Sequence, residues 1–271
     1  MEKVESQVKE TIEKYNLIEK EDKVVVALSG GKDSISVAYI LKKFGFDVHG
    51  LMIDLGMGKW GEVHKTNTEN FCREFDIPLT VVDLKSEIGE DINFVKKVVQ
   101  RRKNVSGCTV CGIIKKWVLN KWAKKMNADK IVTGHNLDDE AQNVLMNFLK
   151  GNVMLGVNSA PATGGRNVSG FAQRIKPLFF VAEDDIKKYS EKMKFNILYD
   201  KCPCSFATYR ADAREFLWKI SNEEKLKIVE GFQKIVPKLK KGFDKELRVC
   251  KKCGEPSSGE ICNFCKMISD I

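Results

Sequence analysis

The sequence lacks a long hydrophobic run. None of its 271 positions lies in a stretch of 18 apolar residues, so a membrane-spanning helix is not expected. The first residues, MEKVESQVKETIEKYNLIEKED, mix charged and apolar side chains and do not contain the apolar centre of a secretory signal peptide. We therefore expect a cytosolic protein with an ordinary globular balance of 43% hydrophobic and 31% charged residues.

The sequence also lacks signs that its nine cysteines form disulfides. No export signal accompanies them, and disulfides are rare in reducing compartments. A chain of this length buries roughly 70–75% of its unfolded surface and needs no covalent staples. Metal binding or catalysis is therefore the expected use of the cysteines.

Acidic residues are in the minority, with 37 Asp and Glu against 46 Lys and Arg and a net charge of +9. The basic residues cluster, and such clusters suit a polyanionic partner, above all nucleic acid. The alternative is that they form solvated faces of lysine-rich helices. The clusters are Lys96, Lys97, Arg101, Arg102 and Lys103; Lys115, Lys116, Lys121, Lys124 and Lys125; and Lys238, Lys240 and Lys241.

Strand-like and helix-like segments alternate along the chain. Apolar runs occur at 24–28, 48–53, 79–82 and 131–133, and helical patterns lie near 33–44, 62–75, 87–103 and 112–127. This alternation predicts an α/β fold with a parallel sheet flanked by helices. Ligands of such sheets bind at the carboxyl ends of the strands.

The chain is predicted to divide into four parts. Residues 1–20 form an N-terminal helix, 21–205 the α/β domain, 206–245 a helical extension and 246–271 a cysteine-rich tail. Further helices are expected near 183–194 and 206–236. Residues 151–170, GNVMLGVNSAPATGGRNVSG, contain five glycines and are predicted to be a mobile loop.

An anion site is predicted where the first strand meets the first helix of the α/β domain. Ser29-Gly30-Gly31-Lys32-Asp33-Ser34 follows the run Val24–Leu28 directly. Free amides at a helix N-terminus bind anions, glycines allow close approach, and the two serines and Lys32 add donors and charge. The segment does not match the GxxxxGK[ST] motif of P-loop NTPases. The alternative is a glycine turn with a Ser or Asp helix cap.

The tail contains two CxxC knuckles, Cys250 with Cys253 and Cys262 with Cys265. Four thiolates at this spacing predict a closed tetrahedral site, and zinc is the expected metal. Such a site would be structural, since the tail is too small to fold without it.

A second set of cysteines comprises Cys108, Cys111, Cys202 and Cys204, whereas Cys72 stands alone and is expected to be a core thiol. The two close pairs are compatible with a second zinc site. A redox CxxC is also conceivable, although the flanking sequence is not that of a thioredoxin unit.

Several motifs resemble one enzyme family in chain order. The segment Ser29–Ser34 resembles the SGGxDS signature of PP-loop ATP pyrophosphatases, which split ATP between its α and β phosphates. Together with the zinc-like tail, the further motifs resemble the TtcA/TtuA family of tRNA 2-thiolation enzymes, in its 2-thiouridine branch, over about residues 20–267. These motifs are Gly107-Cys108-Thr109-Val110-Cys111-Gly112, Thr133-Gly134-His135-Asn136-Leu137-Asp138-Asp139-Glu140-Ala141, Arg174-Ile175-Lys176-Pro177-Leu178 and Cys202-Pro203.

The resemblance implies a fold, a reaction and its cofactors. The fold is that of a PP-loop ATPase of the HUP-like type, and three cysteines hold a [4Fe–4S] cluster with one open iron. ATP and Mg²⁺ adenylate the C2 oxygen of a tRNA pyrimidine, sulfide attacks that carbon, and AMP and pyrophosphate are released. The cluster ligands would be Cys108, Cys111 and Cys202, with Cys204 as the alternative third ligand.

The resemblance also implies roles for individual residues. The nucleotide would contact Ser29, Gly30, Gly31, Lys32, Asp33, Ser34, Asp54, Gly134 and His135. Lys115 lies four residues after Cys111, on the same helix face, and would stabilise developing charge. Asp139 would act as acid/base or bind magnesium. The alternatives are a solvated lysine and an aspartate that only complements a helix N-terminus.

The implied partners are tRNA, a second copy of the chain in a homodimer, and a sulfur donor. That donor is free sulfide, a desulfurase or a ubiquitin-like carrier. The sequence departs from the thiouridine branch because it has no cysteine before Cys72, where an N-terminal zinc module is usual. Two other functions stay open: a PP-loop ligase acting on a small molecule, and a zinc-stabilised RNA-binding protein with a vestigial nucleotide site.

Overall fold

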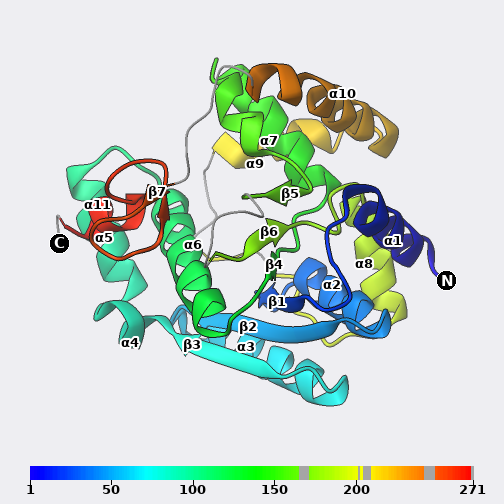
Figure 1. Cartoon of the computed structure of the whole chain (residues 1–271), viewed down its shortest axis with the longest axis horizontal. Helices are drawn as coiled ribbons and strands as arrows, with labels where there is room; N and C mark the ends of the chain where they lie inside the picture. Colours follow the sequence, from blue (N-terminus) through cyan, green and yellow to red (C-terminus); the bar gives the residue numbers. More distant parts are fainter. Residues whose placement is uncertain (165–170, 201, 204–208, 241–247, 270–271) are drawn as a thin grey trace.

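The computed structural model describes residues 1–164, 171–200, 202–203, 209–240 and 248–269. Within them, a six-stranded sheet carries helices on both faces (Figure 1). The strand order is β3-β2-β1-β4-β6-β5, and only the β5–β6 pair is antiparallel. The predicted fold class is therefore confirmed. The strands are β1 Lys23–Leu28, β2 Asp47–Asp54, β3 Leu79–Asp83, β4 Lys130–Val132, β5 Ala162–Thr163 and β6 Gln173–Ile175.

Strand β1 lies inside the sheet and is buried on both faces. Its register pairs Val25 with His49 of β2 and with Ile131 of β4. Val24 and Val26 contribute to the core on one face, whereas Val25 contributes to the core on the other. A parallel strand covered on both faces reads as a continuous apolar run, which is why VVVAL could be recognised in the sequence.

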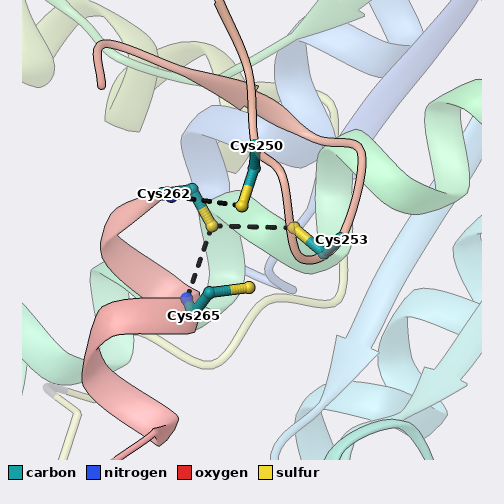
Figure 2. Close-up of side chains that lie close together, drawn as sticks. All are labelled: Cys250, Cys253, Cys262 and Cys265. Carbon is teal, nitrogen blue, oxygen red and sulfur yellow. Dashed lines mark hydrogen bonds between the residues drawn. The ribbon is translucent and has the colours of Figure 1, made fainter. Parts of the chain in front are cut away.

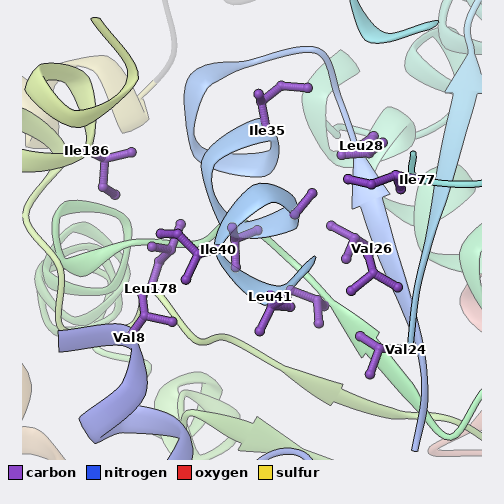
Figure 3. Packing of buried hydrophobic residues seen from close by; sticks show 14 of the residues in the cluster. Val8, Val24, Val26, Leu28, Ile35, Ile40, Leu41, Ile77, Leu178 and Ile186 are labelled. Atoms are coloured by element: carbon purple, nitrogen blue, oxygen red, sulfur yellow. The ribbon is translucent and has the colours of Figure 1, made fainter. Parts of the chain in front are cut away.

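The first face is covered by α1 Lys3–Tyr15, α2 Lys32–Lys43, α3 Gly58–Glu74 and α8 Glu183–Lys192. Figure 3 shows part of this core, in which Ile35, Ile40 and Leu41 of α2 pack near β1. Buried Glu5 accepts hydrogen bonds from Lys43 Nζ and Tyr189 Oη, both at 2.8 Å, and so fastens α1 to α2 and α8.

The second face is covered by α4 Leu84–Ile88, α5 Ile92–Arg102 and α6 Gly107–Lys125. The cysteine-rich tail packs beside them, with β7 Arg248–Val249, β8 Pro256–Ser257 and α11 Asn263–Ile268 (Figure 1). Trp117 of α6 stacks on Phe264 with ring centroids 4.0 Å apart and planes at 13°. The tail therefore shares a hydrophobic core with the helix that carries Cys108 and Cys111.

A third group of helices lies beyond the β5 edge of the sheet. It consists of α7 Leu137–Leu149, α9 Tyr209–Leu217 and α10 Asn222–Lys240, at the top of Figure 1. These helices have small apolar clusters of their own. None of the helices in the described ranges combines the length and apolar character needed to cross a bilayer.

The prediction of an irregular loop over 151–170 was wrong for its first part. Residues Val153–Asn158 form the 3₁₀ helix η1, followed by β5. Gly156 packs against Phe232 of α10 so closely that an added Cβ would lie 2.5 Å from the ring. Glycine here serves a close helix contact, which composition alone does not distinguish from flexibility. Residues 165–170 lie outside the described residues.

Two predicted helices are interrupted. The segment predicted at 206–236 is split into α9 and α10, because Ser221 and Glu224 form a reciprocal capping box. The segment predicted at 87–103 is split at Gly89, whose φ of +82° ends α4 before Asp91 caps α5. The predicted domain boundaries near 205 and 245 lie outside the described residues, and the four-part division stays a prediction.

Candidate active site

The Ser29–Ser34 segment forms a tight loop between β1 and α2. Gly30 adopts φ +77°, a left-handed conformation that favours glycine. Helix α2 begins at Lys32, and its N-cap, Gly31, makes no side-chain capping hydrogen bond. The first amides of a helix have no intrahelical acceptor, so this end of α2 presents free donors to an anion.

The two serines hold the loop in shape. The Ser34 hydroxyl donates to the Gly31 carbonyl at 3.0 Å and accepts from the Ser29 amide at 3.2 Å. The Ser29 and Ser34 hydroxyl oxygens are 3.2 Å apart. Ser34 is buried, whereas Ser29 is exposed. Ser34 therefore fixes the loop from inside, and Ser29 lies at its exposed side.

Lys32 is held between two carboxylates. Its ammonium lies 3.1 Å from Asp33 Oδ2 and 2.8 Å from Oε1 of Glu183, which is the first residue of α8. Burial alone would lower the pKa of Lys32, but Asp33 and Glu183 outweigh it and raise that pKa. The lysine is therefore charged and positioned before any phosphate arrives.

The turn between β4 and α7 packs directly on this loop. A Cβ on Gly134 would lie 2.8 Å from the Ser34 amide nitrogen, so only glycine allows this approach. Asn136 donates from Nδ2 to Asp33 Oδ1 at 3.1 Å and caps α7 together with Asp139. Burial raises the pKa of Asp33, and the nearby Asp139 carboxylate adds to that rise.

The three acids at the start of α7 have different surroundings. Asp138 accepts from the Glu183 amide at 2.8 Å and from Lys225 Nζ at 2.6 Å. Glu140 is fully buried and pairs with Lys176 Nζ at 2.7 Å. Asp139 stays partly exposed, and its Oδ1 lies 3.9 Å from Arg214.

A cavity of about 720 Å³ opens beside the loop, at the carboxyl ends of β1 and β2. It brings together most of the predicted site. Among the described residues, Gly30, Ser34, Gly134, His135 and Asp139 do not line it, and exposed His135 instead contacts Thr133 Oγ1 at 2.8 Å. The predicted residues that do line it are Ser29, Gly31, Lys32, Asp33, Asp54, Cys108, Cys111, Lys115 and Cys202.

Helix α6 begins at Gly107 rather than at the predicted residue 112, because Ser106 caps it by accepting from the Thr109 amide at 3.2 Å. Cys108 and Cys111 therefore lie within its first turns, and Lys115 follows along the cavity. Cys202 reaches the same cavity from the segment after α8, and Cys204 lies outside the described residues. Each of these three described cysteines is at least partly exposed.

The four tail cysteines converge, as Figure 2 shows. Their sulfur atoms all lie within 4.8 Å of one another, with Cys253 and Cys262 at 3.7 Å. A tetrahedral metal with bonds of about 2.3 Å separates its sulfur ligands by about 3.8 Å. Burial would raise the pKa of Cys250, but amides that include those of Cys262 and Cys253 outweigh it and lower that pKa to about 6.

This tail group is a site that could hold one metal ion. It is the one such group of three or more His, Cys, Asp or Glu side chains within the described ranges. Cys108, Cys111 and Cys202 share a cavity but are not gathered around a single-ion position. The second zinc site suggested by the sequence also needs Cys204, which lies outside the described residues, so that alternative stays untested.

Several residues of the cavity had no signal in the sequence. Trp60 and His64 enter it from α3, Glu183 and Lys187 from α8, and Tyr199 and Asp200 from the segment before Cys202. They are ordinary members of helices or of an irregular stretch. Only the packing of α3 and α8 around the loop brings them to the site.

A family profile described as a PP-loop domain matches residues 1–220. The chain is 34% identical over 269 residues to the tRNA-5-methyluridine(54) 2-sulfurtransferase of Pyrococcus horikoshii, covering 97% of this chain and 83% of that protein. The chain belongs to the PP-loop family of tRNA 2-thiolation sulfurtransferases. It is also 30% identical over 280 residues to the cytoplasmic tRNA 2-thiolation protein 1 of Laccaria bicolor, covering 98% of this chain and 77% of that protein.

The structure resembles the U34-tRNA thiolase NcsA from Methanococcus maripaludis, which was solved with its [4Fe–4S] cluster. The TM-score is 0.78 at 25% identity, over 99% of this chain and 87% of that chain. The family resemblance and the fold that it implied are confirmed. The relatives' names include both position 54 and U34 of tRNA, so family membership does not fix the modified nucleotide.

Proposed function

We propose that this protein is an ATP-dependent tRNA 2-thiolation enzyme that uses a [4Fe–4S] cluster. The observation that carries the proposal is the shared cavity, which both the phosphate loop and three cysteines line. Adenylation of a base and delivery of sulfur to it must occur at one point, and this cavity supplies it. The modified base is a pyrimidine, most simply a uridine.

ATP is proposed to bind with its phosphates against the α2 N-terminus. Free amides of that helix, the exposed Ser29 hydroxyl and the pre-positioned Lys32 provide the donors. Gly134 closes the opposite side of the loop, and Asp54 lies farther along the cavity. Substituting Gly134 with alanine would push the β4–α7 turn away from the phosphates.

The three cysteines suit an iron–sulfur cluster. They are at least partly exposed and are contributed by two separate segments around one cavity. Bound by Cys108, Cys111 and Cys202, a [4Fe–4S] cluster would leave one iron open to carry the attacking sulfur. Cys204 remains the alternative third ligand.

Lys115 and Asp139 are proposed to have separate catalytic tasks. Lys115 lines the cavity beyond Cys111, where its ammonium can stabilise charge on the reacting base. Asp139 lies outside the cavity lining but next to Asp33, whose pKa is raised by burial and by Asp139 itself. Two neighbouring carboxylates suit Mg²⁺ bound to the ATP phosphates, and we assign Asp139 to that ion with His135 nearby.

The tail is proposed to hold structural zinc through Cys250, Cys253, Cys262 and Cys265. The 3.7 Å separation between two of the sulfurs matches tetrahedral thiolate ligation. Its core contact with α6 would steady the helix that carries two of the cluster ligands.

The proposed partners are tRNA, a sulfur donor and a second copy of the chain. The exposed basic residues of α5 and α6 are proposed to contact tRNA; they are Lys97, Arg101, Arg102, Lys124 and Lys125. The donor would be sulfide, a desulfurase or a ubiquitin-like carrier. A cytoplasmic location is consistent with the name of one relative.

The test is formation of thiolated tRNA from ATP, sulfide and the anaerobically reconstituted protein. Cys108→Ala should lose the cluster absorbance and thiolation while ATP still binds. Asp139→Ala should keep the cluster and lose turnover. Cys72→Ala is the matched control, since Cys72 is buried outside the cavity. Wild-type thiolation by iron-free Cys108→Ala protein would refute the cluster mechanism.

A further inference from the structure

Helix α3 contributes two polar aromatic side chains to the wall of the cavity. Trp60 and His64 lie one turn apart, and their rings are in contact with centroids 4.1 Å from each other and planes tilted by 51°. His64 sits against the phosphate loop, because a Cβ added to Gly30 would lie 2.6 Å from His64 Nδ1. Both residues therefore border the position proposed for the phosphates.

Their polar atoms are buried without partners. Within the described residues, Trp60 Nε1, His64 Nδ1 and His64 Nε2 are shielded from solvent and form no well-aligned hydrogen bond, although the Gly30 backbone lies close enough to His64 to oppose the lowering of its pKa. His64 is only 4% exposed. Leaving such atoms unpaired costs about 1–3 kcal/mol each. Three of them at one wall of a cavity are characteristic of a site that a ligand completes.

The chemistry of these atoms restricts the ligand. Indole nitrogen only donates, so Trp60 requires an acceptor. Burial lowers the pKa of His64, although a hydrogen-bond contribution from the Gly30 backbone and the charge of Asp200 partly oppose this. A neutral imidazole has one N–H to donate. His64 lies beside Gly30, and Trp60 lies in the first turn of the 17-residue helix α3. Two donors in these positions match the oxygens of a polyphosphate.

We propose that Trp60 and His64 donate hydrogen bonds to the phosphate chain of bound ATP, completing from α3 the site that the Ser29–Ser34 loop begins. The proposal rests on ATP binding as assigned above. It makes His64 and Trp60 further ligand-contacting residues of the same reaction. The competing explanation is that the pair only packs α3 against the loop.

The two explanations predict opposite effects of His64→Phe on the protein without nucleotide. If His64 only packs, the substitution disturbs a fitted contact and lowers the thermal midpoint. If His64 is a ligand-binding residue, the substitution removes two unpaired buried nitrogens, so the thermal midpoint equals or exceeds that of the wild type. Nucleotide affinity then falls about tenfold to a hundredfold, the effect of one hydrogen bond to a charged group.

The experiment measures calorimetric affinity for ATP, pyrophosphate and adenosine, together with the thermal midpoint of the nucleotide-free full chain. The variants are His64→Phe, His64→Asn, His64→Gln and Trp60→Phe. His49→Phe is the matched control, since His49 is half-buried on β2, bonds Thr80 Oγ1 at 2.9 Å and does not line the cavity. The control should keep wild-type affinity for all three ligands.

We expect His64→Phe and Trp60→Phe to weaken ATP and pyrophosphate binding and to leave adenosine binding unchanged. Asparagine should restore affinity if Nδ1 donates, and glutamine if Nε2 donates. Wild-type affinity in both Phe variants, loss confined to adenosine, or rescue by neither amide would overturn the inference. A wild-type chain that binds no ATP would instead overturn the proposed function on which it rests.

Discussion

Lys32 shows how single residues prepare this site. Its ammonium is positioned by Asp33 and Glu183, so the loop has an ordered cation without a ligand. Removing the charge leaves two partly buried carboxylates facing each other without compensation. The cost to folding should be about 1–3 kcal/mol, below that of a fully buried pair, because both carboxylates retain some exposure.

We predict that Lys32→Met abolishes adenylation but leaves the cluster absorbance intact. Phosphate stabilisation is lost, whereas the three cysteines lie elsewhere in the cavity. The measurements are pyrophosphate release and the visible spectrum of the reconstituted protein. Lys42→Met is the control, since Lys42 lies at the opposite end of α2, where it pairs with Asp76. Normal pyrophosphate release by Lys32→Met would contradict this role.

His64 also leads to a prediction about pH. Burial lowers its pKa in the folded state, so below its ordinary pKa the unfolded chain binds more protons than the folded one. Stability of the wild type therefore falls as the pH drops through about 6.5 toward the lowered value. His64→Phe removes this pH-dependent loss of stability. The thermal midpoint of the variant should therefore rise relative to that of the wild type as the pH falls through about 6.5.

The relevant measurement is the difference in thermal midpoint between the two proteins at each pH. Comparing them cancels contributions from His49 and His135, whose pKa values are also lowered. Asp200 is the carboxylate that opposes the shift of His64. A difference that stays constant or narrows as the pH falls would show that His64 is not a destabilising buried base.

At the scale of elements, the tail depends on its metal site and on α6. Four cysteines gather sulfur atoms within 4.8 Å, and Phe264 stacks on Trp117. Without metal, the knuckles have little apolar surface of their own to hold them together. The tail should therefore unfold as a unit while the sheet persists.

We predict that the Cys253→Ser/Cys262→Ser double variant loses about one zinc ion per chain, as a four-thiolate site requires. Residues 248–269 should become sensitive to protease, and ATP affinity should be retained because the tail does not line the cavity. Metal analysis and limited proteolysis check both. Cys72→Ala should retain zinc. Full zinc content in the double variant would refute the assignment.

At the scale of the whole molecule, the net charge is +9. Contacts within the protein decide which lysine side chains are available to contact RNA. Lys121 is engaged by Glu87 at 2.7 Å, whereas Lys124 and Lys125 are exposed and lie over the rings of Phe171 and Trp122. Reversing the charge of Lys121 would therefore break its ion pair with Glu87 and disturb the fold, in addition to any tRNA contact.

We predict that Lys124→Glu/Lys125→Glu weakens tRNA binding and reduces its salt dependence. Each lost phosphate contact should reduce the slope of log affinity against log salt by about one. Filter binding between about 50 and 200 mM salt measures that slope. Lys9→Glu/Lys20→Glu, on the exposed side of the N-terminal segment, is the control with equal charge change. An unchanged slope would place the tRNA elsewhere.

Much of the architecture could be predicted because its signals are local. The runs around Val24–Leu28 and Ile131–Thr133 are buried on both faces of a parallel sheet, so they read as apolar segments between helical patterns. The breaks at Gly89 and Ser221 were missed because a helical period continues across them. Gly156 was misread because the partner that explains it, Phe232, is distant in sequence.

The sequence by itself determined the groups whose members are neighbours in the chain. The loop Ser29–Ser34 and the knuckles from Cys250 to Cys265 need only local backbone geometry to bring donors together. The family resemblance implied that Cys202 and Cys111 act together, and the tertiary structure places both at one cavity. Only the tertiary structure decided that Glu183 holds Lys32 and that His64 packs against Gly30. These contacts depend on how the connections between strands place α3, α6 and α8 around one edge of the sheet. The spacing of residues in the sequence does not encode the distance between such elements.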